Sequence, residues 1–307
     1  MEPLQFTTAH YIKLGRGGEY AEDSFQHNRL RFGWRKQSVE DIQAKRWKKI
    51  ERQLLKGNKN KLGPARADLN ALRRISEAGP DVVWITFHEA KLWWTRIVGP
   101  DVIQDDISKY RSTLPWSDKS FDGKRLLVVN DLPGKIAKLQ GFRATTCRVK
   151  EVELLQRLLN GTRSPLATDI SRKQAALAEA LTRAIKELHW KDFETLADLV
   201  FRHAGWIRVS VLGQQAKGYD LELREPITSD RYVVQVKSTA GLADLRKTSK
   251  QFSRKDYKRV FFVVHSPEKS LSGAFDLPAH VEFVPPNRLG ELALDAGLAD
   301  WLEDKVA

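Results

Sequence analysis

The amino-acid sequence predicts two domains. The first, over residues 1–165, is an α+β domain built on a small sheet or barrel with helices; the second, over 166–307, is an α/β domain with a mixed central sheet. The length of 307 residues suits two domains of ordinary size. The segment 160–170 is rich in turn residues, which is typical of a linker. Strands outnumber helices before this segment, and the order after it is α–β–β–β–α–β.

The first domain is expected to contain three helices. Ser38 as N-cap and Gly57 as a stop signal define a helix over 38–57. Proline in the first turn and glycine at the end define another over 64–79, and the third covers 150–159. Apolar alternation predicts the remaining elements, which are strands at 10–16, 29–35, 107–113, 125–130 and 142–149 and a hairpin at 81–99.

The second domain is expected to begin with two helices, over 171–190 and 191–205, because apolar residues recur there at helical spacing. The rest of the domain is predicted as a strand at 207–213, a hairpin at 218–241, a helix at 242–254, strands at 259–266 and 280–286, and a helical tail.

The net charge of +13 is unevenly distributed along the chain. Residues 1–168 carry a net charge of +12, and residues 169–307 carry +1. This asymmetry indicates a nucleic acid bound mainly by the first half, through phosphate contacts that release counterions. A solvated basic surface is the alternative.

The composition excludes several classes of protein. Cys147 is the single cysteine, which excludes an internal disulfide framework and a multi-cysteine zinc site. No stretch approaches 18 consecutive apolar residues, and the N-terminus lacks the pattern of a signal peptide. We therefore expect a cytoplasmic protein with no membrane partner.

The hairpin at 218–241 carries polar residues at positions that suit metal chemistry. The strand period of two places Gln235 and Lys237 on one face with Val233, while Tyr232, Val234 and Val236 point to the other face and can serve the core. Asp220 begins the preceding strand and can lie opposite them. The Asp220 carboxylate and the Gln235 amide oxygen could hold Mg²⁺, or Mn²⁺ in its place, and Lys237 could position the attacking water.

A neutral glutamine leaves room for one more carboxylate at such a metal site. Glu194 is the candidate, because it lies at the edge of the apolar stripe of the helix at 191–205. A solvated glutamate beside that stripe is the alternative.

These residues resemble the pattern of the PD-(D/E)XK nuclease superfamily, and within it the Mrr-like branch with its D…QXK signature. The resemblance covers about residues 185–270 and rests on the helix with Glu194, Asp220 in GYDLEL, Gln235 and Lys237 in VVQVKST, and the strand RVFFVVHS. It implies a restriction endonuclease-like fold and Mg²⁺-dependent phosphodiester hydrolysis. By this match Asp220 and Gln235 hold the metal ion, Lys237 is the catalytic lysine, and Glu194 is the helix glutamate that many members add. A structural hairpin with a solvated Gln–Lys pair is the alternative.

Aromatic residues are interleaved with lysine and arginine in the first domain, which contains six of the nine tryptophans. Aromatic rings beside cations suit a site that stacks a base extruded from a duplex, although core packing is the alternative for any one of them. Arg16 lies in a glycine-flanked turn that could approach a ligand closely. The candidate residues for base or DNA binding are Arg16, Trp34, Trp84, Trp93, Trp94, Tyr110 and Trp116.

The layout of the first domain, with DVVWITF paired to KLWWTRIVG, is similar to the PUA-like superfamily that includes EVE, ASCH and YTH domains. That resemblance implies an aromatic pocket for a modified base. Together the two resemblances imply a modification-dependent DNA endonuclease that recognises a modified cytosine in double-stranded DNA and acts as a homodimer there. The alternatives are a nuclease of DNA repair or RNA processing without such specificity, and a non-catalytic nucleic-acid-binding protein.

Overall fold

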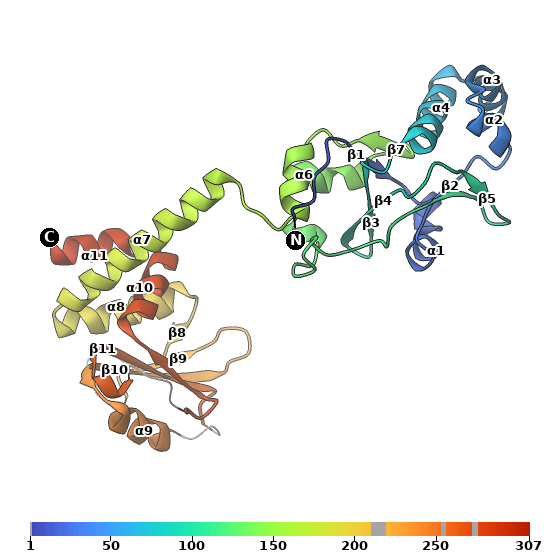
Figure 1. Ribbon diagram of the computed structural model, residues 1–307. Helices are drawn as coiled ribbons and strands as arrows, with labels where there is room; N and C mark the ends of the chain where they lie inside the picture. The colour runs from blue at the N-terminus through green and yellow to red at the C-terminus, as the bar shows by residue number, and fades with distance from the viewer. Residues whose placement is uncertain (1, 210–218, 253–255, 272–275) are drawn as a thin grey trace. The chain divides into compact units, whose positions relative to one another are not determined.

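The computed structural model of the protein describes residues 2–209, 219–252, 256–271 and 276–307. The chain forms two compact units, Met1–Ser164 and Pro165–Ala307 (Figure 1). Pro165 begins helix α7 (Pro165–Glu187), so residues 165–170 are helical and the prediction of a linker there was wrong. Proline at the first helical position favours this start, since its fixed φ suits a helix and its missing N–H costs nothing there.

The N-terminal unit is α+β, as predicted, and contains two small sheets. The first sheet has the strand order β4-β3-β1-β7, in which β1 pairs parallel to β3 and antiparallel to β7. The second has the order β2-β6-β5 and is antiparallel. The strands of the first sheet are β1 (Ala9–Ile12), β3 (Val83–His88), β4 (Lys91–Arg96) and β7 (Thr146–Arg148). Those of the second are β2 (Arg29–Phe32), β5 (Ile103–Gln104) and β6 (Lys109–Ser112).

Several elements of the N-terminal unit differ from the prediction, which did not include the helices at Ala21–Gln26 and Gly134–Ala137. The helix expected over 38–57 is broken into two helices, because Lys45 adopts a left-handed conformation with φ of 52°. The strand expected at 125–130 is reduced to isolated bridges at Leu126 and Val128. The helices of this unit are α1 (Ala21–Gln26), α2 (Val39–Gln43), α3 (Trp47–Gly57), α4 (Leu62–Glu77), α5 (Gly134–Ala137) and α6 (Val152–Leu159). Short 3₁₀ helices lie at Arg16–Gly18, Val129–Asp131 and Lys138–Gly141.

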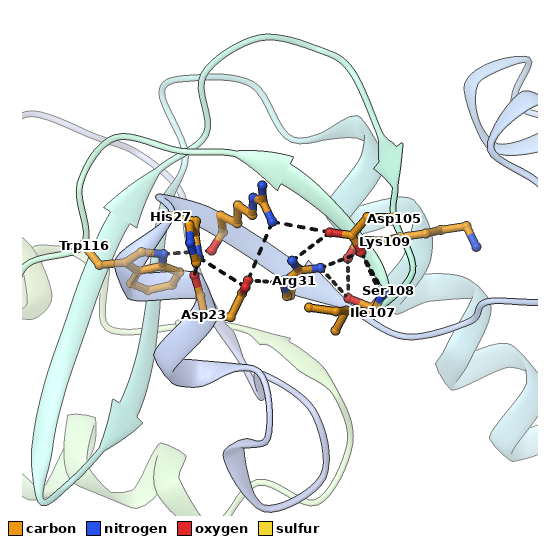
Figure 2. Close-up of polar contacts among 9 residues, drawn as sticks. Asp23, His27, Arg31, Asp105, Ile107, Ser108, Lys109 and Trp116 are labelled. Atoms are coloured by element: carbon orange, nitrogen blue, oxygen red, sulfur yellow. Dashed lines mark hydrogen bonds and ion pairs between the residues drawn. The ribbon is translucent and has the colours of Figure 1, made fainter.

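A buried arginine joins the second sheet to helix α1. The Arg31 side chain on β2 is fully buried and forms a bidentate contact with Asp105, at 2.9 and 2.8 Å. Its Nε donates to Asp23 of α1, so the guanidinium lies between two carboxylates (Figure 2). Asp105 also accepts the backbone N–H groups of Ile107 and Ser108, at 3.0 and 2.9 Å. The pair therefore fixes the turn between β5 and β6 against the sheet.

The C-terminal unit contains one mixed sheet of order β12-β11-β10-β9-β8, as the prediction of an α/β domain requires. Strand β10 pairs parallel to β11 and antiparallel to β9, and β11 pairs parallel to β12. The strands are β8 (Ile207–Arg208), β9 (Leu221–Arg224), β10 (Arg231–Ala240), β11 (Arg259–Pro267) and β12 (Val281–Val284). Parts of the predicted strand at 207–213, hairpin at 218–241 and helix at 242–254 lie outside the described residues, namely 210–213, 218 and 253–254.

Helices cover both faces of this sheet (Figure 1). On one face, α7, α8 (Trp190–His203), α10 (Pro286–Asp295) and α11 (Ala299–Val306) enclose a core that includes Val234, Val236 and Val263. On the other face, α9 (Leu242–Gln251) covers a smaller core with Val233 and Phe262. Within the described part of the chain, no helix has the length and apolar character needed to span a bilayer.

We expect Asp105→Asn to lower the free energy of unfolding of the N-terminal unit by about 3 kcal/mol, because it removes one charge partner from a buried guanidinium. Hydrogen bonding to Arg31 holds the pKa of Asp105 below its usual range. A lowered pKa contributes stability above about pH 4, the unfolded value, and that stability is lost as the pH falls. The variant should therefore lose less stability on acidification.

Denaturant unfolding followed by tryptophan fluorescence between neutral and acidic pH measures both effects. The exposed neighbour Asp106 provides the matched control, Asp106→Asn, which should leave stability unchanged. Equal stability of the two variants would show that the ion pair contributes little.

Candidate active site

Gln235 and Lys237 lie in the middle of β10, whose residues 233–236 are buried and whose following residues 237–239 are exposed. Val233 is fully buried under α9, whereas the sequence pattern assigned the core to the opposite face alone. Gln235 is 6% exposed, and Lys237 is exposed. The shared face is therefore closed at Val233 and opens to solvent towards Lys237.

Asp220 lies directly opposite Gln235, where strands β9 and β10 separate. Leu221, the first residue of β9, pairs with Val234, so the next pair in the antiparallel register is Asp220 with Gln235. The Asp220 carboxylate accepts the Val236 N–H at 2.7 Å and a hydrogen bond from the Gln235 side-chain amide. The Asp220 side-chain oxygen thus accepts the Val236 N–H, which a backbone carbonyl would accept if the ladder continued. This hydrogen bond fixes the carboxylate beside β10.

Glu194 lies on α8 beside the same end of the sheet. Its neighbour Phe193 is buried and contacts the His265 ring on β11, with the ring centroids 5.0 Å apart. His265 follows Val264, which is paired with Lys237. This contact holds the first turn of α8 against β11, and the exposed Glu194 side chain is within electrostatic range of Asp220, since burial and then the charge of Asp220 raise the pKa of Glu194.

The pKa shifts of Asp220 and Glu194 indicate that both carboxylates interact with the charge of Lys237. Burial raises the pKa of Asp220, while the Val236 N–H and the Lys237 charge act in the opposite direction. Burial and then the charge of Asp220 raise the pKa of Glu194, while Lys191 and Lys237 oppose the increase. Two carboxylates whose ionised forms are disfavoured gain from a bound cation.

The donor set of this site fits Mg²⁺. Two carboxylates and an amide oxygen are hard ligands, and Mg²⁺ keeps several waters when it binds few protein groups. The Gln235 amide nitrogen faces Asp220 here, and a half-turn of the amide would present its oxygen instead. No group of three or more His, Cys, Asp or Glu side chains suited to a metal ion occurs in the described residues, so a cation here would rely on the amide as well as the carboxylates.

Residues 185–271 match the family model of the Mrr catalytic domain, described as restriction endonuclease. The C-terminal unit contains a restriction endonuclease domain. The match supports nuclease chemistry in this unit and agrees with the expected PD-(D/E)XK fold. The matched segment includes Glu194, Asp220, Gln235 and Lys237. The PUA-like resemblance of the N-terminal unit lies outside the matched residues.

Two solved structures are similar to parts of the chain. One is the DNA modification-dependent restriction endonuclease AspBHI, at 13% identity and a TM-score of 0.32, with 80% of this chain and 73% of that chain covered. The other is the MspJI restriction endonuclease in complex with a 27-mer oligonucleotide, at 14% identity and 0.29, with 79% and 69% covered. Similarity at this level carries no argument about this chain. A search of curated proteins gave no match.

The N-terminal unit contains a cavity of about 610 Å³ beside a glycine-rich turn. Gly15, Gly17 and Gly18 all have positive φ, and a Cβ at Gly15 would lie 2.5 Å from the Glu19 side chain. Glycine is therefore required where the turn bends around the cavity. The aromatic and cationic side chains of the wall come from several elements and are Tyr11, Lys13, Arg16, Tyr20, Trp34, Phe87, His88 and Arg143.

Only Arg16 and Trp34 of the seven candidate residues for base or DNA binding line this cavity. Trp84, Trp94 and Trp116 are 0%, 9% and 7% exposed and belong to the core, so they cannot serve as surface platforms. Trp93 and Trp94 are adjacent on β4 and point to opposite faces, and each packs against a different core cluster. The Trp93 ring stacks on Phe25 at 4.1 Å, and Tyr110 lies 4.4 Å beneath the Arg29 guanidinium.

Sequence reasoning missed three aromatic residues of the cavity: Tyr20 and Phe87, which are half-buried, and Tyr11, which lines the wall but is buried in the core. Tyr20 lies two residues after the last glycine of the turn, and this position was a usable signal. Tyr11 and Phe87 lie on the neighbouring strands β1 and β3, and their rings are 5.8 Å apart. Nothing in the local sequence distinguishes them from core residues, because their position in the wall depends on the pairing of these strands.

We expect Asp220→Asn to raise the melting temperature of the metal-free C-terminal unit, because it removes a carboxylate whose pKa is raised by burial. Asp220 binds a proton more readily in the folded wild type than in the unfolded chain. The free energy of unfolding therefore falls as the pH rises from the unfolded pKa of Asp220 through its raised folded pKa, and it stays lower at neutral pH. Asparagine keeps an oxygen for the Val236 N–H.

Thermal unfolding of the full chain with and without MgCl₂ at neutral pH measures this effect. At ten times its dissociation constant, Mg²⁺ should stabilise the wild type by about 1.4 kcal/mol and leave Asp220→Asn unchanged. Asp230→Asn, in the same hairpin but paired with Lys258, is the matched control and should respond like the wild type. A magnesium response retained by Asp220→Asn would contradict the assignment of the ligand.

Proposed function

We propose that the protein is a modification-dependent DNA endonuclease. Its C-terminal unit would hydrolyse phosphodiester bonds with Mg²⁺, and its N-terminal unit would recognise a modified base, with modified cytosine as the leading candidate. The observation that carries the proposal is the grouping of Glu194, Asp220, Gln235 and Lys237 at one end of the sheet of a restriction endonuclease domain.

Each residue of this group has a role that follows from its chemistry. Asp220, Gln235 and Glu194 would hold Mg²⁺, and Mn²⁺ could replace it. When bound, such an ion lowers the pKa of a coordinated water and stabilises charge on the phosphate. The backbone hydrogen bond from Val236 fixes the Asp220 carboxylate before substrate arrives. Lys237 would donate to the scissile phosphate and orient the water that attacks phosphorus as the P–O bond to the leaving oxygen breaks.

The cavity of the N-terminal unit supports recognition of an extruded base. Its volume of about 610 Å³ lies in the range of small-molecule sites, and the half-buried Tyr20, Trp34 and Phe87 offer ring surfaces for stacking. Arg16 lies in the glycine turn and could contact the phosphate that flanks an extruded nucleotide. A base enclosed in this way would be selected by the groups that its modification adds.

Cutting both strands of a duplex requires two active sites, and each chain would supply one. The proposal therefore includes a homodimer on DNA. Two alternatives remain. One is a nuclease without preference for modified bases, and the other is a binding protein without cleavage activity. The following experiments distinguish them from the proposal.

We expect Lys237→Ala to reduce cleavage of modified plasmid DNA by about 100-fold or more, because it removes a cation that stabilises the transition state. The assay compares matched plasmids with unmodified, methylated and hydroxymethylated cytosine, with Mg²⁺ and with EDTA. Lys258→Ala is the matched control, since Lys258 is exposed in the same unit and pairs with Asp230. Binding without cleavage by the wild type under every condition would favour the binding protein.

We expect Trp34→Ala to reduce the affinity for modified DNA by about tenfold, because stacking on one base contributes roughly 1–3 kcal/mol. Affinity for unmodified DNA should change little. Trp190→Ala, at an exposed tryptophan of the C-terminal unit, is the control. If the wild type bound and cut all plasmids equally, the proposal of nuclease activity would stand and the proposal of modified-base recognition would be refuted.

A further inference from the structure

One short segment holds most of the excess positive charge of the N-terminal unit. Residues 45–66 contain nine lysines and arginines and one acidic residue, Glu51, so their net charge is +8. They form α3, the following turn and the start of α4, and we call this segment the basic hairpin. Helices α3 and α4 pack against each other at one end of the unit (Figure 1).

The charges of α3 form a row on its exposed side. Lys48, Arg52 and Lys56 are spaced by four residues, so they lie on one face of the helix, and all three are exposed. Like charges at this spacing destabilise a helix. No ion pair is recorded for them within the described residues, whereas Lys49 and Arg46 are both paired with Asp41, at 2.7 and 3.0 Å. The row is therefore unfavourable for the free protein.

The opposite side of the hairpin already has a structural role. Ile50 and Leu54 of α3 and Ala65 of α4 are buried in the core of the unit. The basic row is thus not needed to attach the hairpin. Arg66 of α4 and Arg52 line the same hollow of about 230 Å³ between the helices, so α4 adds a cation to the row.

The hairpin adjoins the cavity that is proposed to hold the extruded base. Asp68 of α4 lines that cavity, and its carboxylate accepts a hydrogen bond of 2.9 Å from the Asn58 side chain at the end of α3. One packed helix pair therefore contributes both a wall of the cavity and the basic row. A strand that places a base in the cavity would pass close to this helix pair.

We propose that the basic hairpin binds the phosphate backbone of the DNA that flanks the recognised base, with Lys48, Arg52, Lys56 and Arg66 as the contacts. Positions four residues apart are about 6 Å apart along a helix, and duplex DNA carries one charge per about 1.7 Å of its axis, so each cation can meet a phosphate. This inference rests on the proposed DNA-binding function and assigns affinity, rather than selectivity for the modification, to the hairpin.

The test is the triple variant Lys48→Gln, Arg52→Gln, Lys56→Gln in the full chain. Affinity for a modified and an unmodified duplex is measured against salt concentration without Mg²⁺, so that no cleavage occurs. We expect both affinities to fall by about 10- to 100-fold at physiological salt. The slope of log K against log salt should decrease by about 0.9 per lost contact, and the ratio of the two affinities should not change.

The matched control is Lys119→Gln, Lys124→Gln, Arg125→Gln, which removes the same charge from exposed positions elsewhere in the unit. It should retain most of the affinity and slope. Circular dichroism and the melting temperature check that both variants are folded. Equal losses in the two triple variants would show a general charge effect and overturn the proposal, as would an unchanged slope in the hairpin variant.

Failure of the modified-base proposal gives a different result. If the wild type binds both duplexes equally, base recognition is refuted, yet the hairpin variant should still lose affinity and slope. If an acidic protein or a membrane surface were the partner, the hairpin variant would bind DNA as the wild type does, and the inference would be wrong.

Discussion

The candidate active site depends on the Asp220 carboxylate at the point where β9 and β10 separate. It accepts the Val236 N–H in place of a backbone carbonyl, which ends the ladder and fixes the carboxylate beside Gln235. Because β10 also pairs with β11, and Phe193 of α8 contacts His265 of β11, the same arrangement brings Glu194 to this carboxylate. The pKa values of both carboxylates are raised, so their ionised forms reduce the stability of the unit, and a bound cation would offset this cost.

The proposed function would divide recognition in the N-terminal unit into two physical contributions. Phosphate contacts supply affinity without sequence information, and stacking with hydrogen bonding in an enclosed cavity supplies selectivity. The basic hairpin would offer the first and the cavity beside Trp34 the second. The fixed turn around Asp105 contributes to this arrangement, since Lys109 follows it on β6 and its buried ammonium donates to the Trp34 carbonyl at 2.8 Å. The loop that carries Trp34, which has a positive φ, is thereby held at the wall of the cavity.

Local signals predicted most of the secondary structure. Caps and apolar periodicity located α3, α4, α8 and β11, and the alternation in β10 placed Gln235 and Lys237 on one face. The errors occurred where tertiary contacts override local preference. Lys45 adopts a left-handed conformation while Asp41 on the preceding helix pairs with two cations, and the segment at 125–130 meets its neighbours only through isolated bridges.

The sequence by itself determined the division into an α+β and an α/β part, the charge asymmetry and the chemical identity of the candidate catalytic residues. These properties follow from residue types and short-range spacing. Only the tertiary structure decided which aromatic side chains are available, because burial depends on what packs against each face: Trp84 is fully buried, while Tyr20 and Phe87 are half-buried and line a cavity. It also decided that Glu194 is close to Asp220, since that proximity depends on α8 packing across β11 and on no local feature of either segment.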